Sequence, residues 1–167
     1  MPLFKKAIYE NSVYPTKILP ELKCPVIAFH SYKGGVGRTL SLIAFARAWT
    51  NIQSDPQHNK LLIIDSDLEA PGLTLIQGQL NETSFSYLDL LTLIQDNNNI
   101  EDIVSASAEL MGTLTLPIET SQQRVDHFFL PTYRYEQQLF DLYASPQTIT
   151  TSRNKEYFLA EVLSQLA

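Results

Sequence analysis

A glycine-rich turn constrains the fold of this chain more than any other feature. The segment KGGVGRT, Lys33 to Thr39, contains three glycines in four positions and lies between two apolar runs, VIAFHS and LSLIAF. Glycine adopts left-handed backbone angles without strain, and it lets peptide N–H groups approach an anion with no Cβ in the way. Between a strand and a helix, such a turn is typical of a phosphate-binding loop.

The flanking residues predict that context. Val26 to Ser31 is short and apolar and predicts a buried strand, while Arg38 to Thr50 is rich in helix formers, apolar nearly all round, and predicts a buried helix. Leu61 to Asp65, LLIID, predicts a second strand. Strand, helix and strand within about forty residues match the size of a βαβ crossover. We therefore expect an α/β fold, with a parallel sheet and flanking helices.

The rest of the chain has a coarser pattern. It predicts helices over Ser84–Gln95, Ile100–Leu110, Tyr135–Tyr143 and Asn154–Ala167, and strands over Thr113–Leu116 and His127–Leu130. Residues 1–24 carry three prolines and no sustained periodicity, so we expect them to form an N-terminal arm. The remaining residues, 25–167, are expected to belong to one domain.

Composition excludes several classes of function. The formal net charge of -6, without a basic stripe, argues against a nucleic-acid surface. Cys24 is the only cysteine, and the three histidines lack the spacing of zinc ligands, which argues against disulfides and a zinc site. No apolar run is long enough to predict a membrane span. These features predict a cytoplasmic protein.

The turn offers a phosphate three kinds of group. Its glycines expose backbone amides, Arg38 brings a fixed positive charge, and Thr39 brings a hydroxyl suited to magnesium. A purely structural turn is the alternative, but the spacing of glycines, basic residue and threonine favours phosphate. The candidate nucleotide-binding residues are Lys33, Gly34, Gly35, Val36, Gly37, Arg38, Thr39 and Leu40.

Two carboxylates follow the second predicted strand. Asp65 ends the apolar run, and Asp67 follows two positions later. In open parallel sheets, ligands bind at the carboxyl ends of the strands, so we expect both carboxylates at the same edge as the glycine turn. There Asp65, together with Thr39, is a candidate magnesium residue. Either aspartate alone could instead cap the following segment, Glu69 to Gly72, which is expected to be a turn.

The glycine turn and the segment with the two aspartates resemble the motifs of a known family. SYKGGVGRT followed by DSDLEAPGL resembles the deviant Walker A and Walker A′ motifs of the MinD/ParA/NifH class of P-loop ATPases, in particular the group with arginine in the last basic position. The resemblance spans Val26 to about Leu73 and continues more faintly through FFLPTYRYEQQLFDL, residues 128–142. It implies a P-loop NTPase fold that binds ATP and Mg²⁺ as a switch, coupled to a homodimer, a second subunit or a downstream domain.

The same resemblance implies roles for individual residues. Lys33 corresponds to the signature lysine that reaches the partner's phosphates, and Arg38 takes the place of the ordinary Walker lysine. Lys33, Asp65 and Asp67 are then the candidate catalytic residues, with the two aspartates near the metal and the attacking water.

One element of the class is missing from the sequence. No apolar run ending in aspartate follows Asp65, although these ATPases carry such a Walker B strand. We therefore expect the chain to be the front part of a longer or split ATPase module, in which hydrolysis requires downstream elements or a partner. The alternative is a non-catalytic, degenerate P-loop module that mediates assembly through its terminal helix and open sheet edge.

Overall fold

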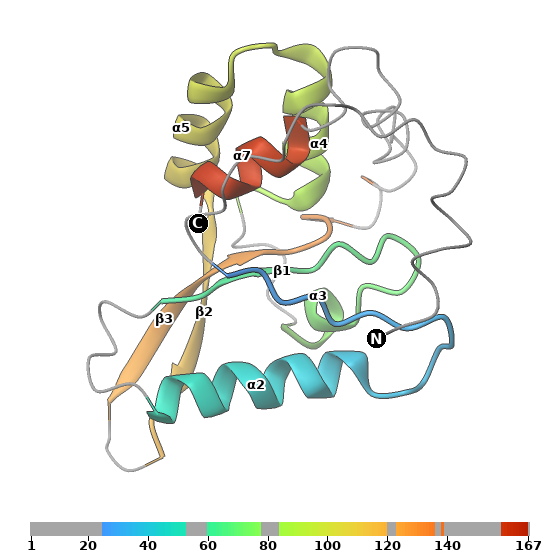
Figure 1. Ribbon diagram of the computed structural model, residues 1–167, viewed down its shortest axis with the longest axis vertical. Helices are drawn as coiled ribbons and strands as arrows, with labels where there is room; N and C mark the ends of the chain where they lie inside the picture. Colours follow the sequence, from blue (N-terminus) through green and yellow to red (C-terminus); the bar gives the residue numbers. More distant parts are fainter. Residues whose placement is uncertain are drawn as a thin grey trace.

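A small sheet with helices on both sides forms the body of the protein (Figure 1). The computed structural model describes residues 25–52, 60–77, 84–119, 123–135, 138 and 158–166. The helices are α2 (Arg38–Ile52), α3 (Gly72–Gln77), α4 (Tyr87–Asp96), α5 (Ile100–Leu110) and α7 (Phe158–Leu166). The strands are β1 (Leu62–Ile64), β2 (Gly112–Pro117) and β3 (Arg124–Leu130). The predicted mixed α/β class is confirmed, while the N-terminal arm lies outside the described residues.

The strands of the sheet lie in the order β1-β3-β2, and the sheet contains both parallel and antiparallel pairs. β1 runs parallel to β3, with Leu62 opposite Phe128, whereas β2 runs antiparallel to β3, with Gly112 opposite Phe129. The expectation of a parallel sheet is therefore wrong for β2. Only residues 118–123 join β2 to β3, and a parallel connection needs a dozen or more residues to cross over.

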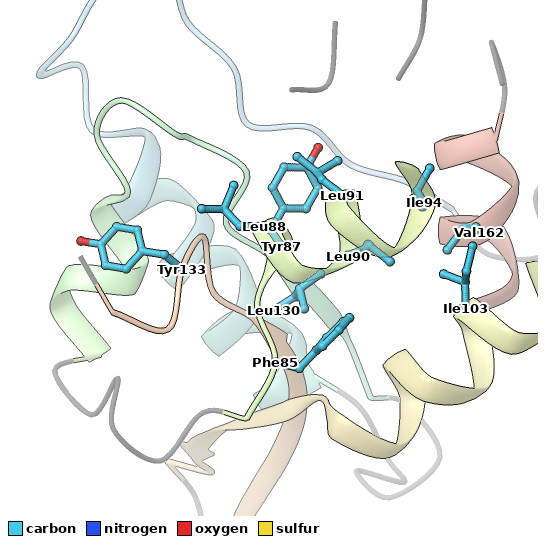
Figure 2. Close-up of a cluster of buried hydrophobic side chains, with 10 residues drawn as sticks. All are labelled: Phe85, Tyr87, Leu88, Leu90, Leu91, Ile94, Ile103, Leu130, Tyr133 and Val162. Carbon is cyan, nitrogen blue, oxygen red and sulfur yellow. The ribbon is translucent and has the colours of Figure 1, made fainter. Parts of the chain in front are cut away.

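Each face of the sheet packs against its own set of helices. Neighbouring residues of a strand point to opposite faces, so Ile63 and Phe129 join one core, and Ile64 and Leu130 join the other. The first core contains Ala46 of α2. The second core gathers α4, α5 and α7 over the sheet (Figure 2). Its buried members are Phe85, Tyr87, Leu88, Leu90, Leu91, Ile94, Ile103, Leu130, Tyr133 and Val162.

Helix α2 is less buried than its apolar sequence predicts. Only Ala46 and Thr50 are fully buried, while Leu40 is 69% and Ile52 77% exposed. A three-stranded sheet covers one side of the helix and leaves the other side open. The expectation of a buried helix is therefore wrong, although the predicted helix itself is confirmed from Arg38 onward.

The predicted strand over Val26 to Ser31 does not form. These residues belong to no strand, and Val26 is 71% and Ile27 55% exposed. An apolar run becomes a strand only where a neighbouring strand supplies hydrogen bonds, and the described strands pair with one another instead. Phe29 nevertheless contacts α2, with its ring centroid 5.8 Å from that of Phe45.

Capping side chains set the starts of α4 and α5. Helix α4 starts at Tyr87, later than predicted, because Ser86 accepts a hydrogen bond from the Asp89 amide and Asp89 accepts one from the Ser86 amide. Helix α5 has its predicted bounds, and the side chain of Asn99 caps it through the Glu101 amide.

Three of the remaining predicted elements are confirmed, and one falls mostly outside the described residues. The strands predicted at 113–116 and 127–130 are confirmed within β2 and β3. The last helix is confirmed over Phe158–Leu166, and the helix predicted at 135–143 falls mostly outside the described residues. The short helix α3 was not predicted, and it begins at Gly72, the last residue of the expected turn. None of the helices in the described ranges is long and apolar enough to cross a membrane.

Candidate functional site

The glycine turn is open to solvent. Gly35 and Gly37 have φ of 73° and 83°, the left-handed region that glycine adopts without strain. A Cβ built at Gly34, Gly35 or Gly37 would meet no atom within 4 Å. Space for an anion therefore lies directly over this backbone.

The amides that lead into helix α2 have no acceptor among the described residues. The first hydrogen bond at the start of α2 runs from the Ser41 amide to the Gly37 carbonyl, at 2.8 Å. Gly34 and Gly35 form a hydrogen-bonded turn, and no amide from Gly37 to Leu40 donates to another residue in the described part of the chain. Because the first amides of a helix lack intrahelical partners and carry partial positive charge, they are available to an anion.

Arg38 and Asp67 form an ion pair that joins the two motif blocks. The Arg38 guanidinium lies 2.9 Å from Asp67 Oδ2, and both side chains are about one-third exposed, 32% and 27%. The other carboxylate oxygen, Oδ1, accepts hydrogen bonds from the amides of Glu69 and Ala70 at 3.2 and 3.0 Å. Asp67 therefore lies beside the end of the glycine turn. Arg38 binds one of its carboxylate oxygens, and two backbone amides bind the other.

Asp65 is buried and bound to threonines rather than to the glycine turn. Its Oδ2 accepts hydrogen bonds from both the amide and the hydroxyl of Thr74 at 2.8 Å, and the side chain of Thr132 donates to its carbonyl at 2.8 Å. Asp65 is 8% exposed, and both threonines are fully buried. This network joins the ends of β1 and β3 to the start of α3.

Sequence reasoning missed Thr74 and Thr132, because a single threonine carries no periodic signal. The loop that holds Thr132 is itself anchored on α4. The amides of Tyr87 and Leu88 donate to the carbonyls of Pro131 and Thr132 at 2.7 and 3.2 Å. Arg134 pairs with Asp89: one terminal nitrogen donates at 3.0 Å, and Nε lies 2.9 Å away without an aligned hydrogen bond.

Gly72 packs against Thr39, which brings the two motif blocks into direct contact. A Cβ at Gly72 would lie under 3.0 Å from Thr39 Oγ1 and 3.3 Å from its Cβ. Only glycine lets the start of α3 approach the threonine this closely. The other candidates face solvent: Val36 is 54% and Leu40 69% exposed, and Lys33 forms no ion pair within the described residues.

Substitution of Gly72 tests this packing. We expect Gly72→Ala to lower the free energy of unfolding by about 1–3 kcal/mol, because the new methyl group collides with Thr39. Adding Thr39→Ala should recover part of that loss, since it removes the hydroxyl and the methyl group that collide. Urea denaturation of the two single variants and the double variant measures both effects. Simple additivity of the two losses would contradict the contact.

A buried histidine lies at the other end of the sheet and is not part of the candidate site. His127 Nδ1 accepts a hydrogen bond from the Leu61 amide at 3.1 Å, so the proton lies on Nε2, which is 2.7 Å from Thr50 Oγ1. Burial lowers the pKa of His127, Lys60 lowers it further, and Asp126 opposes them. The structure therefore holds this ring in its neutral form.

Stability should accordingly fall in mild acid. The native pKa of His127 lies below the unfolded value of about 6.5, so the unfolded chain binds the proton first and the stability falls as the pH drops through that value. The fall stops once the native pKa is passed. Chemical denaturation at about pH 7.5 and 5.5 should show the loss in the parent protein and a smaller loss in His127→Gln. Equal losses would assign the pH dependence to other groups.

Comparisons with protein-family models, with curated proteins and with solved structures find no match to this chain. Functional assignment therefore depends on the motif residues and their geometry.

Proposed function

We propose that this chain is a nucleotide-binding switch domain that takes up ATP with magnesium at the glycine turn. The observation that supports this most strongly is the turn itself. Gly35 and Gly37 are left-handed, open space lies over the backbone, and the amides leading into a fifteen-residue helix have no described acceptor. A phosphate chain is the anion that such a loop accommodates.

Local charge supports the proposal although the chain as a whole is acidic. The net charge of -6 disfavours general anion binding. The start of α2 carries partial positive charge, Arg38 adds a guanidinium that Asp67 partly offsets, and the exposed Lys33 lies beside this region in the sequence. Affinity for phosphate should therefore be confined to this turn.

The nearby side chains fit a magnesium ion that arrives with the nucleotide. Hydroxyl and carboxylate oxygens are the ligands that magnesium prefers, and Thr39 and Asp65 offer them. Within the described residues, no three histidine, cysteine, aspartate or glutamate side chains gather into a group that could hold a metal ion. Magnesium usually retains waters and takes phosphate oxygens as ligands, and it would supply charge neutralisation here.

Both candidate catalytic carboxylates already bind other groups of the protein. Asp65 Oδ2 accepts from Thr74, and Asp67 pairs with Arg38 while it accepts two backbone amides. Orientation of an attacking water requires a carboxylate that can reach it. We therefore propose nucleotide binding as the primary activity, with ATPase turnover dependent on elements supplied by a partner or by a longer chain.

A P-loop NTPase fold and a cytoplasmic location belong to the same proposal. The glycine turn leads directly into α2, and the two aspartates follow β1, a strand that runs parallel to β3. This arrangement agrees with the resemblance to the MinD/ParA-like class. The preference for ATP is proposed from that resemblance alone.

Equilibrium binding of a fluorescent ATP analogue, with and without magnesium, tests the proposal. Saturable binding that is displaced by unlabelled ATP is the expected result. The competing function is a degenerate module that mediates assembly without nucleotide. It is favoured by the open apolar side of α2, where Leu40 and Ile52 are exposed. Association that is unaffected by nucleotide, together with no detectable ATP binding, would support that function instead.

Substitution of Lys33 tests the switch. Lys33 is exposed and forms no ion pair within the described residues, so it is free to reach a partner's phosphates. We expect Lys33→Ala to weaken nucleotide-dependent self-association about ten-fold and nucleotide binding less than three-fold. Sedimentation velocity with and without ATP measures the first effect, and a binding titration measures the second. Equal losses in both would argue against a role for Lys33 across an interface.

A further inference from the structure

The ion pair between Arg38 and Asp67 places a negative charge inside the region proposed for phosphate. The two side chains are 2.9 Å apart, and Arg38 is the first residue of α2. A cation at a helix N-terminus is electrostatically unfavourable, and the carboxylate of Asp67 offsets that charge. The Arg38 guanidinium is thus paired with the Asp67 carboxylate in the structure.

A phosphate that binds Arg38 must approach the same carboxylate. Asp67 cannot easily turn away, because its Oδ1 accepts hydrogen bonds from the Glu69 and Ala70 amides. Two like charges within a few ångströms repel by about 1 kcal/mol in water and more near a protein surface. The repulsion is greatest for a nucleotide whose phosphates carry their full charge.

We propose that Asp67 is a specificity-determining residue that makes the site select the magnesium complex of a nucleoside triphosphate over the free nucleotide. Asp67 repels bare phosphates and tolerates phosphates whose charge the cation offsets. This inference rests on the proposed function and adds to it the form of the ligand. It gives Asp67 a role in binding, where the family resemblance implied a role in catalysis.

Replacement of Asp67 with asparagine removes the charge and keeps the fold. The amide oxygen of asparagine can still accept from the Glu69 and Ala70 amides, so the turn after β1 is retained. Asp96→Asn is a matched control, because Asp96 is an exposed aspartate at the end of α4 and its replacement changes the net charge equally.

The test compares the affinity for ATP in excess EDTA with the affinity in excess magnesium, by titration calorimetry on the full chain. We expect Asp67→Asn to tighten binding of metal-free ATP about five- to ten-fold and to tighten binding of the magnesium complex by a smaller factor, so that the preference for the complex falls. Asp96→Asn should change neither.

Several results would overturn the inference. Equal strengthening of both affinities would show that Asp67 does not discriminate, and weakening of both would show that it serves the bound ligand directly. The same shift in Asp96→Asn would assign the effect to net charge. A parent protein that binds ATP in neither condition would overturn the proposed function itself, and the inference with it.

Discussion

Gly37→Val should abolish nucleotide binding. Gly37 has a φ of 83°, which a β-branched residue adopts only with strain. The position that a Cβ would take at Gly37 has no other atom within 4 Å. Valine would fill that space and turn the neighbouring amides away from the ligand. The loss of about two charge-assisted hydrogen bonds lowers the affinity about 100-fold or more. A titration with fluorescent ATP analogue measures it.

A control in the same turn separates local strain from the loss of the site. Gly34 also has open space around it, but its φ does not lie in the left-handed region, so Gly34→Ala should leave the backbone of the turn unchanged. We expect that variant to bind at least ten-fold more tightly than Gly37→Val. Thermal unfolding of both variants shows whether the turn alone is altered. Undiminished binding in folded Gly37→Val would exclude the turn as the phosphate site.

Removal of the Asp65 carboxylate should strongly destabilise the fold. Asp65→Ala removes the acceptor of the Thr74 amide and the closer acceptor of its hydroxyl, whose other contact is Thr132 Oγ1 at 3.4 Å, in a position where Thr74 is fully buried. Buried donors that lose their acceptor cost about 1–3 kcal/mol each, so we expect a loss of about 2–4 kcal/mol in the free energy of unfolding. Urea denaturation, followed by circular dichroism, measures the loss.

Asparagine at the same position is the matched control. Asp65→Asn keeps one oxygen that can accept from Thr74, so its stability should lie between those of the parent protein and Asp65→Ala. If Asp65→Ala were as stable as the parent protein, the buried network would contribute nothing. Asp65 would then be better explained as a residue retained for its charge.

Strong local patterns made much of the fold predictable. Helix α5 has its predicted bounds, because its apolar residues recur at helical spacing and Asn99 caps it. Strand β3 alternates between buried and exposed residues, and its predicted part is confirmed. The predictions that were wrong concern strand pairing between segments that lie far apart in the sequence. Val26 to Ser31 has the composition of a strand but pairs with none of the described strands, and the antiparallel partner of β3 could not be deduced from periodicity.

The candidate site was predictable to a similar extent. Asp67 lies beside Arg38, as expected for residues after a strand and a glycine turn that meet at one edge of a sheet. The sequence did not show that Asp65 would bind Thr74 and Thr132, because those contacts depend on where α3 and the loop after β3 pack. Nor did it show why Gly72 is glycine, since the reason is the distant Thr39.

An NMR titration shows directly whether the backbone amides of the glycine turn bind phosphate. Uniformly ¹⁵N-labelled protein is titrated with ATP and magnesium, and the amide resonances are followed residue by residue. We expect the largest shifts at the amides from Gly34 to Thr39, saturating with one binding constant. Unchanged resonances in this segment, with or without shifts elsewhere in the protein, would contradict it.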